Sequence, residues 1–154
     1  MSNKTCCFLG NSKQLSYRQR DNVFQLFYVE IDKLIKKGYT KFIFSGNSDF
    51  ESAARIAVIS HGIRNSDIKT IYIASLNDNI EQLQKAYDQV IIPDISKHTI
   101  SQRNRYIIDN SDYCCFYIKN FVGDAFVAML YAKKINKPQI NFAYENIHLN
   151  KSLR

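Results

Sequence analysis

The sequence predicts an α/β domain, a three-layer sandwich in which helices cover both faces of a mainly parallel sheet. Short segments made almost entirely of apolar residues alternate along the chain with segments in which the apolar residues have helical periodicity. Alternating strands and helices are typical of parallel sheets, and continuously apolar strands are typical of burial on both faces. The length of 154 residues suits one domain, so we expect residues 1–154 to form a single unit.

Five short apolar segments are expected to form the strands. The first stops at Gly10, and the fourth, with the sequence YCCFYI, is the most strongly apolar. β-branched and aromatic residues favour strands, and glycine or polar residues end them. The expected strands span residues 5–9, 41–45, 69–74, 113–118 and 138–142. A brief apolar run at 89–92 stops at Pro93.

Five segments between these strands have helical spacing of their apolar residues. The expected helices span residues 21–37, 49–61, 81–87, 101–110 and 124–135. We expect Asp21 to cap the start of the first helix and Gly38 to end it. This arrangement of strands and helices predicts a Rossmann-like fold.

Two of the helices carry more specific signals. Ser48 and Glu51 have the S-x-x-E spacing of a capping box at the start of the second helix. In the last helix, Phe126, Leu130 and Tyr131 are the expected core residues.

The basic character of the chain allows several kinds of partner. The formal net charge is +7, which suits nucleic acid, an acidic membrane surface or a small anionic ligand. The basic residues are scattered, so most of this charge is expected on the solvated surface. No segment has the roughly 18 apolar residues that span a bilayer, and no secretory signal is visible at the N-terminus. We therefore expect a cytoplasmic protein with no membrane partner.

The four cysteines form two adjacent pairs, Cys6-Cys7 and Cys114-Cys115, inside apolar runs. Neighbouring residues on a strand point to opposite faces, so a disulfide within either pair would be strained. We expect small buried apolar side chains rather than zinc ligands, because the four sulfurs would not converge. The three histidines also lack metal-ligand spacing. We expect no metal and no cofactor.

Three junctions between an expected strand and the following helix carry glycine and small polar residues. Ligands of parallel α/β sheets bind outside the carboxyl ends of the strands. Glycine allows the backbone to approach a ligand, and the following helix offers free N–H groups to an anion. The same residue types also serve turn geometry alone, and that alternative stays open. The expected ligand-binding residues in these loops are Gly10, Asn11, Ser12, Ser45, Gly46, Asn47, Gly123 and Asp124.

Arg103 and Asn104 lie in the most distinctive stretch of the chain, SQRNRYIIDNSD. A guanidinium near the carboxyl edge of a parallel sheet can hold a phosphate through paired hydrogen bonds. The alternative is that Arg103 and Arg105 cover a helix face, or pair with Asp109 or Asp112. We therefore treat Arg103 and Asn104 as candidate ligand-binding residues.

Several stretches resemble the SLOG superfamily, and within it the YpsA-like proteins. KTCCFLGNS resembles the family's strand and T-G-H-R loop, and GYTKFIFSGNSDFES resembles its G-Y-x-x-F-I-S-G-G-A-x-G-F-D segment. RNRYIIDNSDYCCFYI is similar to the R-N-R-Y-M-V-D-x-S-D stretch, which is the most specific match. VGDAFVAMLYAKK resembles the family's G-G-T helix start. The resemblance extends from Lys4 to about Phe142 and implies one SLOG-like Rossmann domain that binds nucleotides or nucleotide-derived ligands.

The resemblance also implies a possible chemistry for two residues. The LOG-type phosphoribohydrolases of this superfamily cleave the N-glycosidic bond of nucleoside monophosphates with an arginine and a glutamate. Arg103 matches the arginine, and Glu51 matches an acidic residue of the second loop. The position of the LOG glutamate corresponds to Val127, which can neither accept a proton nor stabilise an oxocarbenium ion. Asp124 also places a negative charge at the helix start where a phosphate would dock.

These departures favour a binding module without catalysis, which senses or sequesters a nucleotide-derived ligand. One alternative is a nucleoside-monophosphate phosphoribohydrolase that uses Arg103 with Glu51 or Asp124. Another is a protein or nucleic-acid interaction module, supported by the net charge. Since SLOG proteins often form dimers, the resemblance also implies a homodimer.

Overall fold

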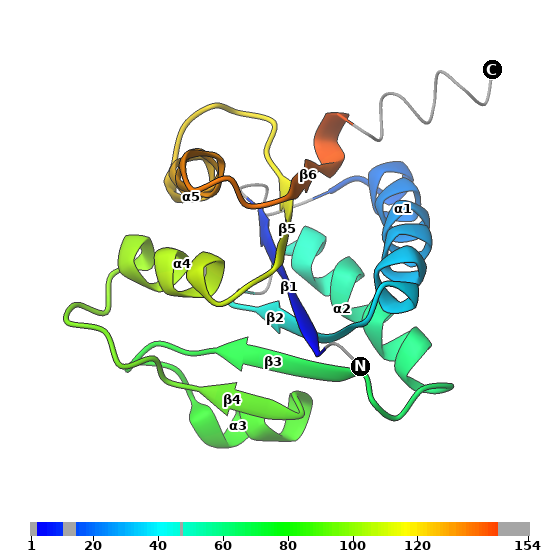
Figure 1. The fold of residues 1–154 in the computed structure, drawn as a ribbon, viewed down its shortest axis with the longest axis horizontal. Coiled ribbons are helices and arrows are strands. Elements are labelled where there is room, and N and C mark those ends of the chain that lie inside the picture. Colours follow the sequence, from blue (N-terminus) through cyan, green and yellow to red (C-terminus); the bar gives the residue numbers. More distant parts are fainter. Residues whose placement is uncertain (1–2, 11–14, 47, 145–154) are drawn as a thin grey trace.

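The computed structural model describes residues 3–10, 15–46 and 48–144, in which strands and helices alternate along the chain (Figure 1). The strands are β1 (Lys4–Gly10), β2 (Tyr39–Phe44), β3 (Lys69–Ile73), β4 (Gln89–Ile91), β5 (Tyr113–Tyr117) and β6 (Gln139–Asn141). The helices are α1 (Tyr17–Lys36), α2 (Asp49–Gly62), α3 (Ile80–Ala86), α4 (Ile100–Asp109) and α5 (Asp124–Lys134). The brief run at 89–92, which carried no strand assignment in the sequence, contains the whole of the short edge strand β4.

The strands form one sheet in the order β4-β3-β2-β1-β5-β6, and every neighbouring pair is parallel. From β1 the chain adds β2, β3 and β4 on one side, and then returns to add β5 and β6 on the other. The order therefore reverses between β1 and β5, which is where ligands bind in folds of this kind. The predicted α/β fold with a Rossmann-like sheet is confirmed.

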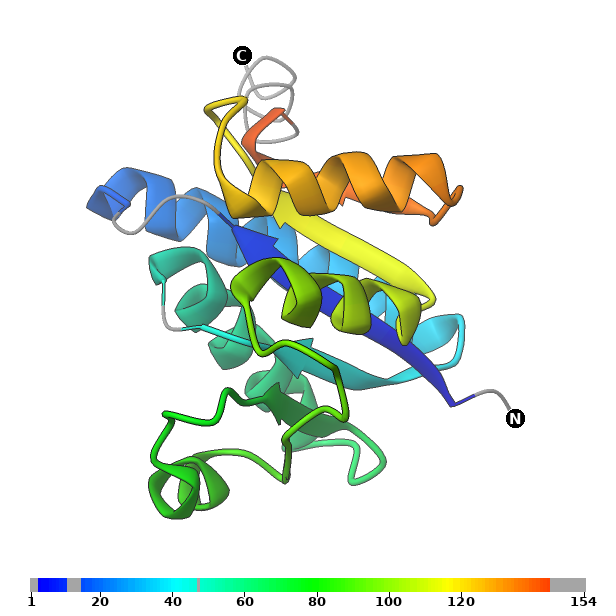
Figure 2. The same ribbon diagram turned by 90° about the vertical axis from the view of Figure 1, so that its left-hand side faces the viewer.

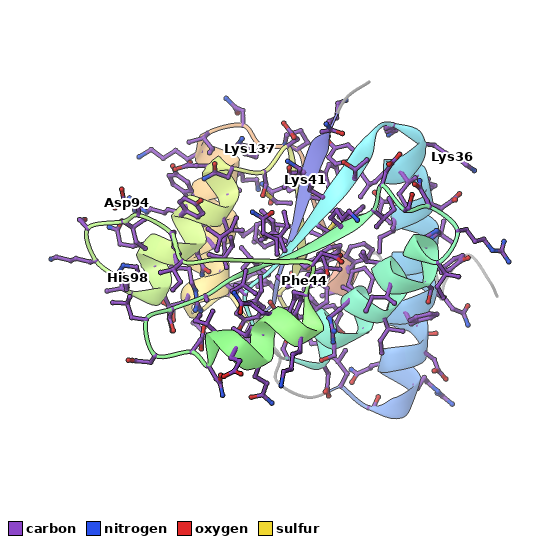
Figure 3. All side chains as sticks on the ribbon, turned by 90° about the horizontal axis from the view of Figure 1, so that it is seen from below. Lys36, Lys41, Phe44, Asp94, His98 and Lys137 are labelled. Atoms are coloured by element: carbon purple, nitrogen blue, oxygen red, sulfur yellow. The ribbon has the colours of Figure 1, made fainter. Side chains whose placement is uncertain are left out.

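Helices cover both faces of this sheet, as Figures 1 and 2 show. Helices α1 and α2 pack on one face over an aromatic cluster in which Phe8 stacks on Phe44 with ring centroids 5.0 Å apart. Phe27 of α1 meets Phe8 edge to face at 5.6 Å. Such contacts add to the burial of large apolar surfaces, so this layer forms the larger part of the core. Figure 3 shows Phe44 in the interior, with Lys36 and Asp94 at the periphery.

Helices α4 and α5 cover the opposite face of the sheet. Helix α5 meets the sheet through small side chains, and the buried ones are Ala125, Ala128 and Ala132. Of the residues expected to form its core face, Phe126 and Tyr131 are partly buried and pack against the core, whereas the expectation for Leu130 is wrong, because it is 47% exposed. Alanine lets the helix backbone approach the sheet closely, so the helix turns its larger side chains outward or sideways.

Helix α1 begins four residues before the expected start at Asp21. Ser16 is its N-cap, accepting from the Gln19 backbone N–H at 3.2 Å, and the Gln19 side chain accepts from the Ser16 N–H at 2.9 Å. This reciprocal capping box replaces the cap expected at Asp21. The expected end at Gly38 is confirmed, because Gly38 follows the cap residue Lys37 with a φ of 97°.

The four cysteines lie at the centre of the molecule, on β1 and β5, and each is at most 1% exposed. Cys6 and Cys115 face the α1/α2 layer, where their sulfurs are 3.6 Å apart, and burial raises the pKa of both thiols. Cys7 and Cys114 are direct neighbours in the sheet register and face the α4/α5 layer. The expectation of small, buried side chains is confirmed.

Within the described ranges, none of the helices combines the length and the apolar character that a membrane crossing requires.

Candidate functional site

A cleft of about 660 Å³ opens at the carboxyl ends of β1, β2 and β5, where the strand order reverses. The first turns of α2, α4 and α5 border it. This volume lies within the range of ordinary small-molecule sites. The lining residues are Leu9, Gly10, Ser45, Gly46, Ser48, Glu51, Ile100, Arg103, Asn104, Asn120, Val122, Gly123, Asp124 and Ala125.

The cleft brings together most of the residues singled out in the sequence. Seven of the ten candidate ligand-binding residues line it, and so does Glu51: the seven are Gly10, Ser45, Gly46, Arg103, Asn104, Gly123 and Asp124. They come from four separate parts of the chain, which meet because parallel strands end at the same edge of the sheet. Asn11, Ser12 and Asn47 lie outside the described residues.

Glu51 lies in the floor of the cleft and is only 6% exposed. The backbone N–H of Ser45 donates to its Oε1 at 3.2 Å, and the hydroxyl of Ser48 donates to its Oε2 at 3.1 Å. Ser48 also caps α2 by accepting from the backbone N–H of Glu51. Burial raises the pKa of this carboxyl group, against the opposing effect of its hydrogen bonds with the Ser45 loop.

Arg103, on the first turn of α4, brings a guanidinium to the cleft. Its Nε is buried and has no hydrogen-bond partner within the part of the chain that the structure describes. The suggested carboxylate partners bind elsewhere, since Asp112 accepts from the Thr5 backbone N–H at 2.9 Å and Asp109 accepts from the Tyr131 hydroxyl at 2.6 Å. A buried donor without a partner is costly and therefore suits a group that an external acceptor completes.

Arg105 differs from Arg103 although the two lie on the same helix. Its guanidinium carbon lies 5.1 Å from the centroid of the Tyr131 ring, and its side chain does not line the cleft. This contact fits the alternative in which an arginine covers a helix face. Arg103 and Arg105 therefore form a natural pair for comparison.

The three glycines of the cleft serve different purposes. A Cβ at Gly10 would lie 2.8 Å from Cδ2 of Phe50, so this glycine allows the end of β1 to pack against α2. Gly123 has a φ of 92°, a conformation that other residues rarely adopt, and a Cβ added there would meet no described atom within 4 Å. Gly46 is close to a charged group of the cleft, since a Cβ there would lie 2.5 Å from Oε2 of Glu51.

Several contributors to the site carried no signal in the sequence. Ile100 lines the cleft but is an exposed apolar residue at the start of a helix, which is unremarkable in a sequence. Tyr72 of β3 helps to hold the Ser45 loop of the cleft in place, because its hydroxyl donates to the Ser45 carbonyl oxygen at 3.1 Å. Burial, aided by the charge of Asp78, raises the pKa of Tyr72 to about 12. Its position in a buried strand gave no reason to connect it with a loop 27 residues away.

The charges in the cleft are mixed. Arg103 faces a space that also contains the carboxyl groups of Glu51 and Asp124, the latter in the first turn of α5. No ion pair joins Arg103 to either carboxylate among the residues described. Within the same residues, no group of three or more histidine, cysteine, aspartate or glutamate side chains could hold a metal ion. The arrangement can therefore hold one anionic group by direct contact with arginine.

Comparisons with known proteins inform the fold rather than the ligand. No protein-family model matches the sequence, and no curated protein is significantly similar to it. Among solved structures, the DNA processing protein A (DprA) of Streptococcus pneumoniae superposes with a TM-score of 0.61 at 14% identity. The superposition covers 88% of this chain and 49% of that one, so this chain spans about half of the DprA length.

A second solved structure covers nearly the whole chain. The molybdenum cofactor binding protein of Rippkaea orientalis superposes with a TM-score of 0.60 at 20% identity, over 99% of this chain and 85% of that one. At such identities the likeness shows the fold alone, and both superpositions agree with the α/β fold described above.

Proposed function

We propose that the cleft binds a nucleotide-derived small molecule and holds its anionic group at Arg103. The observation that carries this proposal is the Arg103 guanidinium, whose buried Nε lacks a partner within the described chain and which lines a cleft of small-molecule size. Arginine holds phosphate groups through paired, charge-assisted hydrogen bonds.

The walls of the cleft favour a ligand with an apolar ring beside its anionic group. Leu9, Ile100, Val122 and Ala125 supply apolar surface around the polar centre. Small-molecule sites typically combine such walls with a few fixed polar groups. A nucleotide has both parts, a flat base and a phosphate, and the cleft lies at the position in the sheet where ligands of this fold class bind.

Binding without catalysis fits the residues present. Val127, which stands in place of the LOG glutamate, is 49% exposed on α5 and does not line the cleft. A phosphoribohydrolase would have to use Glu51 or Asp124 in its place. Incubation with nucleoside monophosphates separates the two functions, because hydrolysis releases free base and simple binding does not.

The proposed binding can be tested by thermal shift with nucleotides, cyclic nucleotides and ADP-ribose derivatives. A bound ligand at 100 times its Kd stabilises the folded state by about 2.7 kcal/mol, which raises Tm by several degrees. Arg103→Ala should abolish that shift, whereas the matched control Arg105→Ala should retain it. If no compound in the panel shifts the wild-type Tm, or if Arg103→Ala responds like the wild type, the proposed function is wrong.

The likeness to a DNA processing protein favours nucleic acid as a second candidate ligand. The net charge of +7 would contribute through release of counterions from the phosphate backbone. Binding of this kind weakens steeply between 50 and 200 mM salt, by a factor that depends on the number of phosphate contacts. Fluorescence anisotropy with labelled single-stranded and double-stranded DNA over this range tests it, and affinity independent of salt would count against it.

A further inference from the structure

Glu51 occupies the part of the cleft that an anionic ligand would otherwise use. The loop between β2 and α2 joins a strand to the start of a helix, and the backbone N–H groups of such loops commonly bind phosphate. Here the Ser45 N–H donates to Glu51 Oε1 at 3.2 Å, so the carboxylate of the chain itself takes the place of a bound anion.

The surroundings hold this carboxyl group firmly in the loop. The Ser48 hydroxyl donates to Oε2 at 3.1 Å, and the side chain is 6% exposed. A Cβ at position 46 would lie 2.5 Å from Oε2, so the absence of a side chain at Gly46 makes room for the carboxylate. Moving Glu51 away would leave a buried N–H and a hydroxyl without their acceptor, at a cost in free energy.

A second helix start at the cleft also carries an acidic side chain of the protein. Asp124 is the first residue of α5 and lines the cleft, and its charge complements the helix dipole there. Two of the three helix starts that border the cleft, those of α2 and α5, are therefore supplied with carboxylates, whereas the first turn of α4 has no acidic side chain. Arg103 is the cationic side chain that lines the cleft.

We propose that Glu51 determines the specificity of the cleft, restricting it to ligands that carry a single anionic group at Arg103 and that present hydroxyl or ammonium donors toward the β2–α2 loop. This inference rests on the proposed function, because it specifies the ligand of the same cleft. A second phosphate directed toward Glu51 is disfavoured, since it would meet a like charge and an N–H that already has an acceptor. Oxygen lone pairs of the carboxylate remain available to accept from a ligand hydroxyl.

The experiment compares 5′-monophosphates with 5′-diphosphates of adenosine, guanosine, cytidine and uridine by isothermal titration calorimetry. The wild type should bind the monophosphate of the preferred base at least about tenfold more tightly than its diphosphate, the size of effect that about 1.4 kcal/mol of repulsion produces. Glu51→Ala, which frees the Ser45 N–H, should remove or reverse this preference, so that the ratio of the diphosphate Kd to the monophosphate Kd falls to about one or below.

Glu51→Gln provides a second variant because it keeps the volume and one acceptor oxygen while removing the charge. Glu51→Gln should reduce the ratio of the diphosphate Kd to the monophosphate Kd, and this result does not depend on whether Glu51→Ala folds. Glu81→Gln, which removes a charge from the first turn of α3 outside the cleft, is the matched control and should leave the ratio unchanged.

The outcomes separate this inference from the proposed function. Binding that requires Arg103, with equal affinity for monophosphate and diphosphate in the wild type, would overturn the role of Glu51 and leave the proposed function standing. A ratio that Glu51→Gln leaves unchanged would do the same. Failure of all eight nucleotides to bind would overturn the inference together with nucleotide binding at the cleft.

Discussion

The hydroxyl of Tyr72 donates a hydrogen bond to the backbone carbonyl of Ser45, 3.1 Å away, and so ties strand β3 to the loop that forms one wall of the cleft. Both groups are buried. The same residue, Ser45, donates its N–H to Glu51, so both backbone polar groups of this position are satisfied by side chains. The loop is thereby held on both sides without regular secondary structure.

Tyr72→Phe should destabilise the protein by about 1–2 kcal/mol, because the Ser45 carbonyl loses its donor inside the protein. Urea unfolding followed by circular dichroism measures the change. Tyr87→Phe is the matched control, since Tyr87 lies beside Tyr72 with ring centroids 5.0 Å apart and its hydroxyl donates to no described residue. Equal free energies of unfolding for the two variants would contradict the role given to the Tyr72 hydroxyl.

Thr70→Val should cost about 1–3 kcal/mol of stability. Thr70 donates to Asp88 Oδ2 through its N–H at 2.8 Å and through its hydroxyl at 3.1 Å, and its hydroxyl accepts from the Asp88 N–H at 3.2 Å. Valine keeps the shape but removes both hydroxyl bonds at the start of β3 and β4. Thr40→Val is the control, because its single exposed contact to Asn3 is long at 3.5 Å. Chemical denaturation of both variants should show the larger loss for Thr70→Val.

Ala132→Leu should destabilise the protein by about 1–3 kcal/mol through overpacking. Ala132 is fully buried where α5 rests on the sheet, so three additional carbon atoms would have to displace the groups around it. The same substitution at exposed Ala86 of α3 serves as the control for the intrinsic effect of leucine in a helix. Thermal unfolding should give a lower Tm for Ala132→Leu than for Ala86→Leu, and the opposite order would argue against a tight α5 contact.

The stability contributed by Glu51 should depend on pH. Burial raises its pKa in the folded protein, so the folded state binds a proton more tightly than the unfolded state does. That contribution is fully present below the unfolded pKa and is lost as the pH rises through the folded pKa. Relative to Glu51→Gln, which does not titrate, the wild type should therefore become less stable as the pH increases above the ordinary glutamate range. Urea unfolding of both proteins at pH 4 to 8 measures this, and a difference independent of pH would contradict it.

Most of the fold could be predicted because its signals are local. The strands differ from the expected spans by at most two residues at either end, since apolar runs and terminating glycines are visible in the sequence. The order of the strands depends on contacts between distant segments, such as the pairing of Cys7 with Cys114. The alternation of strands and helices along the sequence nonetheless predicted the parallel arrangement that the structure has.

The errors have physical causes that single residues illustrate. The start of α1 was misplaced because Ser16 and Gln19 form a capping box, and Asp21 was a plausible cap in the wrong position. Leu130 of α5 was expected in the core because large apolar residues ordinarily point inward, whereas close packing on the sheet selects alanines such as Ala128. At the cleft, Ile100 and Tyr72 reach the site through tertiary packing, which leaves no pattern in the neighbouring sequence.

The cysteines at the centre of the sheet provide an intrinsic reporter of how the molecule opens. Because all four thiols are at most 1% exposed, a water-soluble alkylating reagent can modify them only after the layers covering them separate. Cys6 and Cys115 report on the α1/α2 side, and Cys7 and Cys114 on the α4/α5 side. Mass spectrometry of pulse-alkylated protein would thus record, molecule by molecule, whether the two halves of the core come apart together or one before the other.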